Sequence, residues 1–91
     1  MNGYKNAETY FCSLWLDADA MTRREFIALA KATEDDDPDE VLKNVADAMR
    51  RVVEDGAPVL SGSLYGDLLD AAIESIDFRQ IAAEYIEEAR T

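Results

Sequence analysis

Apolar residues recur three and four positions apart along most of the chain, which is the spacing of one face of an α-helix. No alternation of apolar and polar residues between hairpin turns, the pattern of a half-buried strand, is present. The first helical stretch follows Asn6, a favoured N-cap residue, and lasts about ten residues. Its apolar side consists of Ala7, Tyr10, Phe11, Leu14 and Trp15. We expect this aromatic face to lie in the core, with an interface anchor as the alternative for part of it.

A second helix follows a break at residues 17–19, where two aspartates flank an alanine. Thr22 and Glu25 match a capping box, in which each side chain satisfies the other's backbone amide, so we expect the helix to begin there. Its apolar side consists of Phe26, Leu29 and Ala30.

The third helix has the clearest start. Asp37 can cap it, Pro38 suits its first turn, and Glu40 completes a second capping box. Its apolar stripe consists of Val41, Leu42, Val45, Met49, Val52 and Val53. Gly56 followed by Pro58 predicts the end of this helix, with Gly56 in the left-handed conformation.

Two helices complete the chain. Ser63 or Ser61 can cap the fourth helix, whose apolar residues are Tyr65, Leu68, Leu69, Ala72 and Ile76. Asp77 can cap the fifth, and Ile76 and Ile81 on either side of that cap predict a hydrophobic staple at a sharp corner. The apolar residues of the fifth helix are Ile81, Tyr85, Ile86 and Ala89.

The length and these elements predict a single helical domain over residues 1–91, an all-α, compact bundle of four or five short helices. Asp and Glu number 20 against nine Lys and Arg, which gives a net charge of −11. This charge repels phosphates and anionic lipids, so we expect a basic partner, with no direct nucleic acid and no membrane. No secretion signal or membrane-spanning run is present, so we expect a host cell cytoplasmic location.

Catalysis and metal binding have little support. The chain has no His and only one cysteine, Cys12, so neither a zinc cluster nor an internal disulfide is available. Calcium loops starting at Asp17 or Asp35 lack the required Gly at position six and Glu at position twelve. We expect no enzyme, no metal site and no cofactor, and interpret Cys12 as a small buried apolar residue.

Six of the seven residues at positions 34–40 are acidic. Helix capping needs only Asp37 and Glu40, and the repulsion among the others costs stability, which indicates a use for them. The alternative is that this run merely solvates a loop and complements a helix dipole.

A second acidic feature lies in the last third of the chain. Asp67, Asp70, Glu74 and Asp77 are spaced for one helix face, with one charge per roughly 5 Å. A DNA strand carries one phosphate per about 3.4 Å, so the charge densities are of the same order. Three acids continue on the last helix: Glu84, Glu87 and Glu88. The alternative is an ordinary solvent-facing surface of amphipathic helices.

Five short blocks stand out along the chain. They are YKNAET at 4–9, LWLD at 14–17, DLL at 67–69, ID at 76–77 and IA at 81–82. Together they resemble a group of small acidic proteins of unknown function found in phages, plasmids and some prokaryotic genomes. The chain departs from that group at Tyr10, where Trp is expected, and in the acidic run at 34–40. The resemblance implies a mobile-element setting and supplies no chemistry.

The leading hypothesis is a mobile-element-encoded stoichiometric inhibitor of a host nucleic-acid-targeting defence complex, of the anti-CRISPR or anti-restriction type. It would act as an acidic nucleic-acid mimic towards a CRISPR effector or restriction enzyme. The residues expected to bind this partner are Asp35, Asp36, Asp37, Asp39, Asp67, Asp70, Glu74, Glu84, Glu87 and Glu88.

The alternative is a small helical adaptor, or a homo-oligomeric protein-binding module such as a homodimer, that uses an apolar surface. Its expected anchors are Trp15, Leu16, Tyr65 or Phe78, with the acids serving solubility. The two hypotheses differ in salt response, because screening weakens a charged interface and leaves an apolar one in place.

Overall fold

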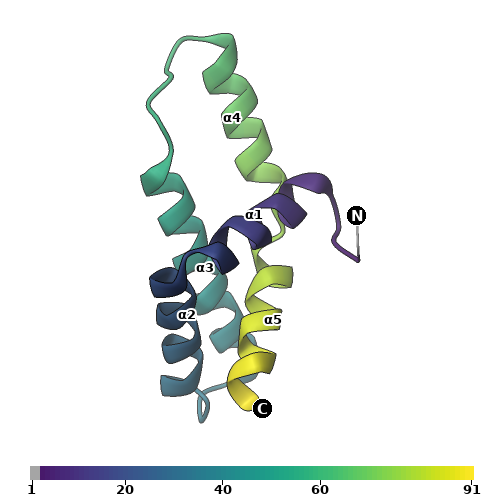
Figure 1. Ribbon diagram of the computed structural model, residues 1–91, viewed down its shortest axis with the longest axis vertical. Coiled ribbons are helices and arrows are strands. Elements are labelled where there is room, and N and C mark those ends of the chain that lie inside the picture. The colour runs from purple at the N-terminus through teal and green to yellow at the C-terminus, as the bar shows by residue number, and fades with distance from the viewer. Residues whose placement is uncertain (1–2) are drawn as a thin grey trace.

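A computed structural model describes residues 3–91, which form five α-helices and no strand. The helices are α1 (Ala7–Ala18), α2 (Ala20–Ala32), α3 (Pro38–Gly56), α4 (Leu64–Ser75) and α5 (Phe78–Arg90). Helices α2, α3 and α5 lie side by side, and α1 crosses them. Helix α4 extends beyond them, at the end of the molecule opposite the C-terminus (Figure 1). The predicted all-α bundle is confirmed.

The core lies where α5 packs against α3 and α2. Its buried residues are Leu16, Phe26, Val41, Val45, Ala46, Met49, Phe78, Ile81, Ala82 and Tyr85. The stripes predicted for α2, α3 and α5 supply most of this set, although Val52 of the α3 stripe is exposed. The amphipathic patterns of these three helices therefore identify the core correctly.

Four of the predicted helix starts are confirmed by N-cap hydrogen bonds. The N-caps are Asn6, Asp37, Ser63 and Asp77. The start of α2 was predicted wrongly at Thr22, because Asp19 caps this helix by accepting hydrogen bonds from the amides of Met21 and Thr22 at 3.1 and 3.3 Å. Asp19 is the C-cap of α1 and the N-cap of α2, so the N-cap of α2 lies within the break predicted at residues 17–19.

The end of α3 also differs from the prediction. Gly56 is helical, and the chain leaves the helix through Ala57 in an extended conformation. Pro58 favours this conformation in the residue before it, so no left-handed residue is needed there. The left-handed glycine lies further along the connection, at Gly62, with φ +73°.

The first helix is turned the opposite way from the predicted orientation. It buries Thr9, Ser13 and Leu16, whereas Trp15 is 77% and Phe11 52% exposed. The prediction that the aromatic run of α1 lies in the core is therefore wrong. The hydroxyl groups of Thr9 and Ser13 can face the interior because each has a hydrogen-bond partner there.

We call residues 3–9, together with the α4–α5 corner at residues 75–80, the N-terminal clamp. The Asn6 side-chain amide donates to the Ser75 carbonyl at 2.7 Å. The Thr9 hydroxyl donates to Asn6 Oδ1 at 2.6 Å and accepts from the Asp77 amide at 2.9 Å. The Gln80 side chain bonds the backbone of Gly3 and Lys5. The block YKNAET is thus largely structural, since it fixes α1 on the corner.

The apolar stripe predicted for α4 is only partly covered, because Leu69, Ala72 and Ile76 are half-buried. Only Ile73 of this helix is buried, while Tyr65 is 71% and Leu68 57% exposed. Helix α4 packs on α1 and makes no comparable contact with another helix in the described part of the chain. Part of a pattern that predicts burial therefore remains at the surface.

Replacing Thr9 with Val tests the clamp. The change keeps the shape of the buried side chain and leaves the Asp77 amide without its partner, so we expect a loss of about 1–3 kcal/mol in unfolding free energy. Urea denaturation measures it. Thr9→Ser is the control, because it keeps the hydroxyl and loses one methyl group, worth about 0.8 kcal/mol. Equal stability of Thr9→Val and the unaltered protein would contradict the role of the clamp.

Candidate functional site

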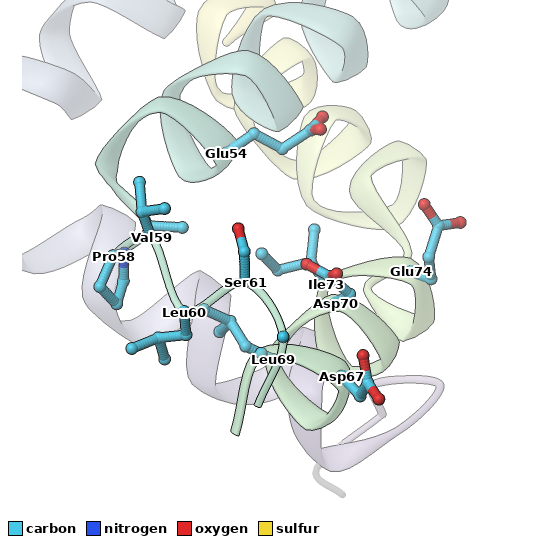
Figure 2. Close-up of a pocket in the computed structure, with 13 residues that line it drawn as sticks. Glu54, Pro58, Val59, Leu60, Ser61, Asp67, Leu69, Asp70, Ile73 and Glu74 are labelled. Carbon is cyan, nitrogen blue, oxygen red and sulfur yellow. The ribbon is translucent and has the colours of Figure 1, made fainter. Parts of the chain in front are cut away.

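Two adjoining concave surfaces lie along α4. The first, which we call the acidic concavity, encloses about 690 Å³ between the end of α3, the α3–α4 connection and α4 (Figure 2). Four carboxylates line it: Glu54, Asp67, Asp70 and Glu74. Leu69 and Ile73 of α4 provide apolar surface at its base. A concave surface with this charge favours a cationic ligand group.

A single cation neutralises part of the acidic concavity. Arg50 pairs with Glu54 at 3.0 Å and also with Glu74, so it joins α3 to α4. Asp67 and Asp70 are exposed and take part in none of the ion pairs found within residues 3–91. These two carboxylates remain available to a partner.

Tight backbone packing shapes the α3–α4 connection. The Ser63 hydroxyl donates to the Leu60 carbonyl at 2.6 Å and accepts from the Gly66 amide at 3.0 Å. A side chain at position 66 would collide with the Leu60 carbonyl group. The absence of a Cβ atom at Gly66 therefore lets the connection lie against α4.

The second surface, which we call the apolar groove, encloses about 450 Å³ between α1, the end of α3 and α4. Its lining is Glu8, Phe11, Cys12, Trp15, Leu16, Val53, Gly56, Ala57, Leu69, Ala72, Ile73 and Ile76. Glu8 is the one charged residue among them. The apolar groove and the acidic concavity share Leu69, Ile73 and Ala57, so they adjoin along α4.

Burial raises the pKa of two groups, one in the apolar groove and one between α1 and α5. Desolvation raises the pKa of the Cys12 thiol to about 11, which keeps the thiol neutral in the apolar groove. Burial also raises the pKa of Tyr85, as does the hydrogen bond that its hydroxyl donates to Asp17 at 2.5 Å. That bond ties α5 to the end of α1.

The ten acidic residues predicted to bind a partner are all exposed. They do not form one continuous row, because they divide between the two ends of a molecule 44 Å long. Asp35, Asp36 and Asp37 lie in the connection between α2 and α3 and Asp39 in the first turn of α3, at the end where the C-terminus lies, whereas α4 is at the opposite end (Figure 1). Glu87 and Glu88 lie in the last turn of α5, whose C-terminus is at the same end of the molecule as the connection between α2 and α3 (Figure 1).

Some of these acids already have intramolecular partners. Glu88 pairs with Arg23, Glu84 accepts a hydrogen bond from the Tyr4 hydroxyl at 3.0 Å, and Asp37 caps α3. Asp77, predicted to continue the acidic row of the fourth helix, caps α5 and lies outside α4. The row on α4 therefore consists of Asp67, Asp70 and Glu74.

Two of the four anchors predicted for an apolar interface are unsuitable. Leu16 and Phe78 are buried in the core, and although Leu16 also lines the apolar groove, neither is exposed enough to anchor a partner. Trp15 and Tyr65 are exposed, as the adaptor hypothesis requires. Glu54 was not among the predicted site residues, although it lies one helical turn beyond Arg50, a spacing that signals an ion pair.

Within residues 3–91, no cluster of three or more His, Cys, Asp or Glu residues is arranged to hold a metal ion. No helix in this range combines the length and apolar character needed to cross a membrane. The chain is therefore an all-α protein with an exposed apolar groove beside an acidic concavity. Comparisons with protein-family models, curated proteins and solved structures find no match.

Replacing Gly66 with Ala tests how the acidic concavity is built. The new methyl group meets backbone that has to move, so we expect a loss of about 1–3 kcal/mol in unfolding free energy. Gly56→Ala is the matched control, since its methyl group meets open space in a helix and removes a glycine penalty of up to about 1 kcal/mol. Thermal unfolding followed by circular dichroism separates them. A Gly66→Ala variant that melts at or above the Gly56→Ala temperature would contradict the packing described.

The raised pKa of Cys12 predicts slow thiol chemistry. Because the ordinary pKa is 9.0 and the folded value is about 11, the thiolate fraction at pH 8 is about a hundredfold lower in the folded protein. We expect the reaction with a disulfide reagent to be slower by about that factor than after unfolding in urea, and to accelerate as pH rises towards 11. Equal rates in the folded and unfolded protein would show that the thiol is not desolvated.

Proposed function

We propose that this protein is a binding module that docks onto another protein through the apolar surface of α1 and α4. The observation that carries this proposal is the exposure of large apolar side chains on these two helices. They are Phe11, Leu14, Trp15, Leu64, Tyr65 and Leu68. Burying one such side chain is worth about 1.5–3 kcal/mol, so a partner that covers several of them gains substantial free energy.

The orientation of α1 supports this proposal. The N-terminal clamp holds Thr9 and Ser13 inward, which turns Phe11 and Trp15 outward. Turning the helix to bury the aromatic rings would break the buried hydrogen bonds of Thr9. The aromatic face is therefore held ready for a partner at a fixed position beside α4, and fixed aromatic side chains are effective interface anchors.

A second function, inhibition of a nucleic-acid-targeting complex by charge mimicry, is favoured by a different observation. Asp67 and Asp70 are exposed, are unpaired within residues 3–91, and line a concave surface. With the acids at 35–39, they leave both ends of the molecule negative. Such a protein would compete with DNA or RNA for a Lys- and Arg-lined groove, and its affinity would fall steeply with salt.

Replacing Trp15 with Ser tests the apolar interface. In pull-downs from a host lysate at high salt, where charge-driven binding is weakened, we expect the unaltered protein to retain a partner that the variant loses. Met21→Ser is the matched control, because Met21 is 69% exposed on α2 and outside the apolar groove. Undiminished capture by Trp15→Ser would contradict docking through this surface.

The charge-mimic function has its own test. We expect the double variant Asp67→Lys, Asp70→Lys to lose inhibition of a CRISPR or restriction effector while remaining folded, because both side chains are exposed. Glu74 is spared, since it pairs with Arg50 and its reversal would disturb the fold. Asp35→Lys with Asp36→Lys is the equal-charge comparison at the opposite end. Full inhibition by the Asp67, Asp70 variant would exclude α4 from mimicry.

A further inference from the structure

We propose that the apolar groove receives an amphipathic α-helix of the partner, with an apolar stripe that enters the groove and Lys or Arg residues beside that stripe. This inference rests on the first function proposed above, docking through α1 and α4, and names the partner segment. It is carried by the lining of the groove together with the charges that border it.

The lining of the groove suits an apolar helix face. One wall is the outward face of α1, with Phe11 and Trp15. The other is formed by Leu69 of α4 and by Ile76, the residue that follows this helix. Between them Ala72 is small, which leaves room for side chains of a guest. A groove between two helices matches the recognition mode in which a guest helix inserts apolar anchors spaced three and four residues apart.

The charges that border the groove select a basic helix. Glu8 lies in the lining itself, and the acidic concavity adjoins along α4, with Asp67 and Asp70 among its carboxylates. Cations flanking the apolar stripe of a guest would face these carboxylates. A second copy of this chain is disfavoured as the occupant, because each copy carries a net charge of −11.

A peptide titration tests this proposal. Trp15 is the only tryptophan of the chain and lies in the groove wall, so its fluorescence reports occupancy directly. The probe is a synthetic peptide of about 18 residues, or five helical turns, built from Leu and Lys in an amphipathic helical pattern without tryptophan. The comparison peptides are a scrambled sequence of identical composition, which lacks the stripe, and a Leu and Glu peptide with the original pattern.

We expect a saturable blue shift of Trp15 emission with the patterned Leu and Lys peptide, persisting at high salt. The scrambled peptide should bind about tenfold more weakly, and the Leu and Glu peptide should not bind. Phe11→Lys should weaken binding by about tenfold or more, whereas Met21→Lys, an equal charge change outside the groove, should not. Circular dichroism melts verify that both variants are folded.

Four results would overturn the proposal. Equal binding of the patterned and scrambled peptides would mean that charge alone attracts them, and equal binding by Phe11→Lys would place the peptide elsewhere. Dimerisation in light scattering that buries Trp15 without any peptide would show that a second copy fills the groove. If no peptide binds but Trp15→Ser still loses its partner in pull-downs, the docking function stands and only the helical occupant fails.

Discussion

The hydroxyl group of Thr9 makes the two hydrogen bonds on which the arrangement of the other elements depends. It is fully buried, donates to Asn6 at the start of α1, and accepts from the Asp77 amide at the start of α5. One oxygen atom thereby links two helix N-termini that are 68 residues apart in sequence. Because the group is buried, losing either bond would leave a polar atom without a partner, which fixes the rotation of α1.

The rotation of α1 determines which surfaces the molecule offers. With Thr9 and Ser13 inward, the aromatic side of α1 becomes one wall of the apolar groove. Helix α4, held by its corner with α5, by α1 and by the Arg50 pair with Glu74, forms the other wall. The neighbouring face of α4 lines the acidic concavity, so an apolar surface and a charged one adjoin along this helix. A partner that covers α4 would meet both kinds of chemistry together.

The features predicted correctly are those that depend on residues close together in sequence or on a regular apolar spacing. The caps at Asn6, Asp37, Ser63 and Asp77 were found because capping is local, and the stripes of α2, α3 and α5 because those helices pack on one another. The face of α1 was predicted wrongly, since its burial follows from a hydrogen bond to a residue 68 positions away. Periodicity did not show which residues of the α4 stripe are exposed, because it cannot show whether a covering element exists. The division of the acids between two ends likewise follows from topology.

The central claim is that the N-terminal clamp holds Trp15 in solvent beside an open groove. Acrylamide quenching of Trp15 fluorescence in the dilute free protein tests it most directly, because no other tryptophan contributes. We expect quenching close to that of the chain unfolded in urea, because the Trp15 side chain is 77% exposed. Strong protection from acrylamide together with blue-shifted emission in the monomer would show that α1 turns its aromatic face inward, and would contradict the account.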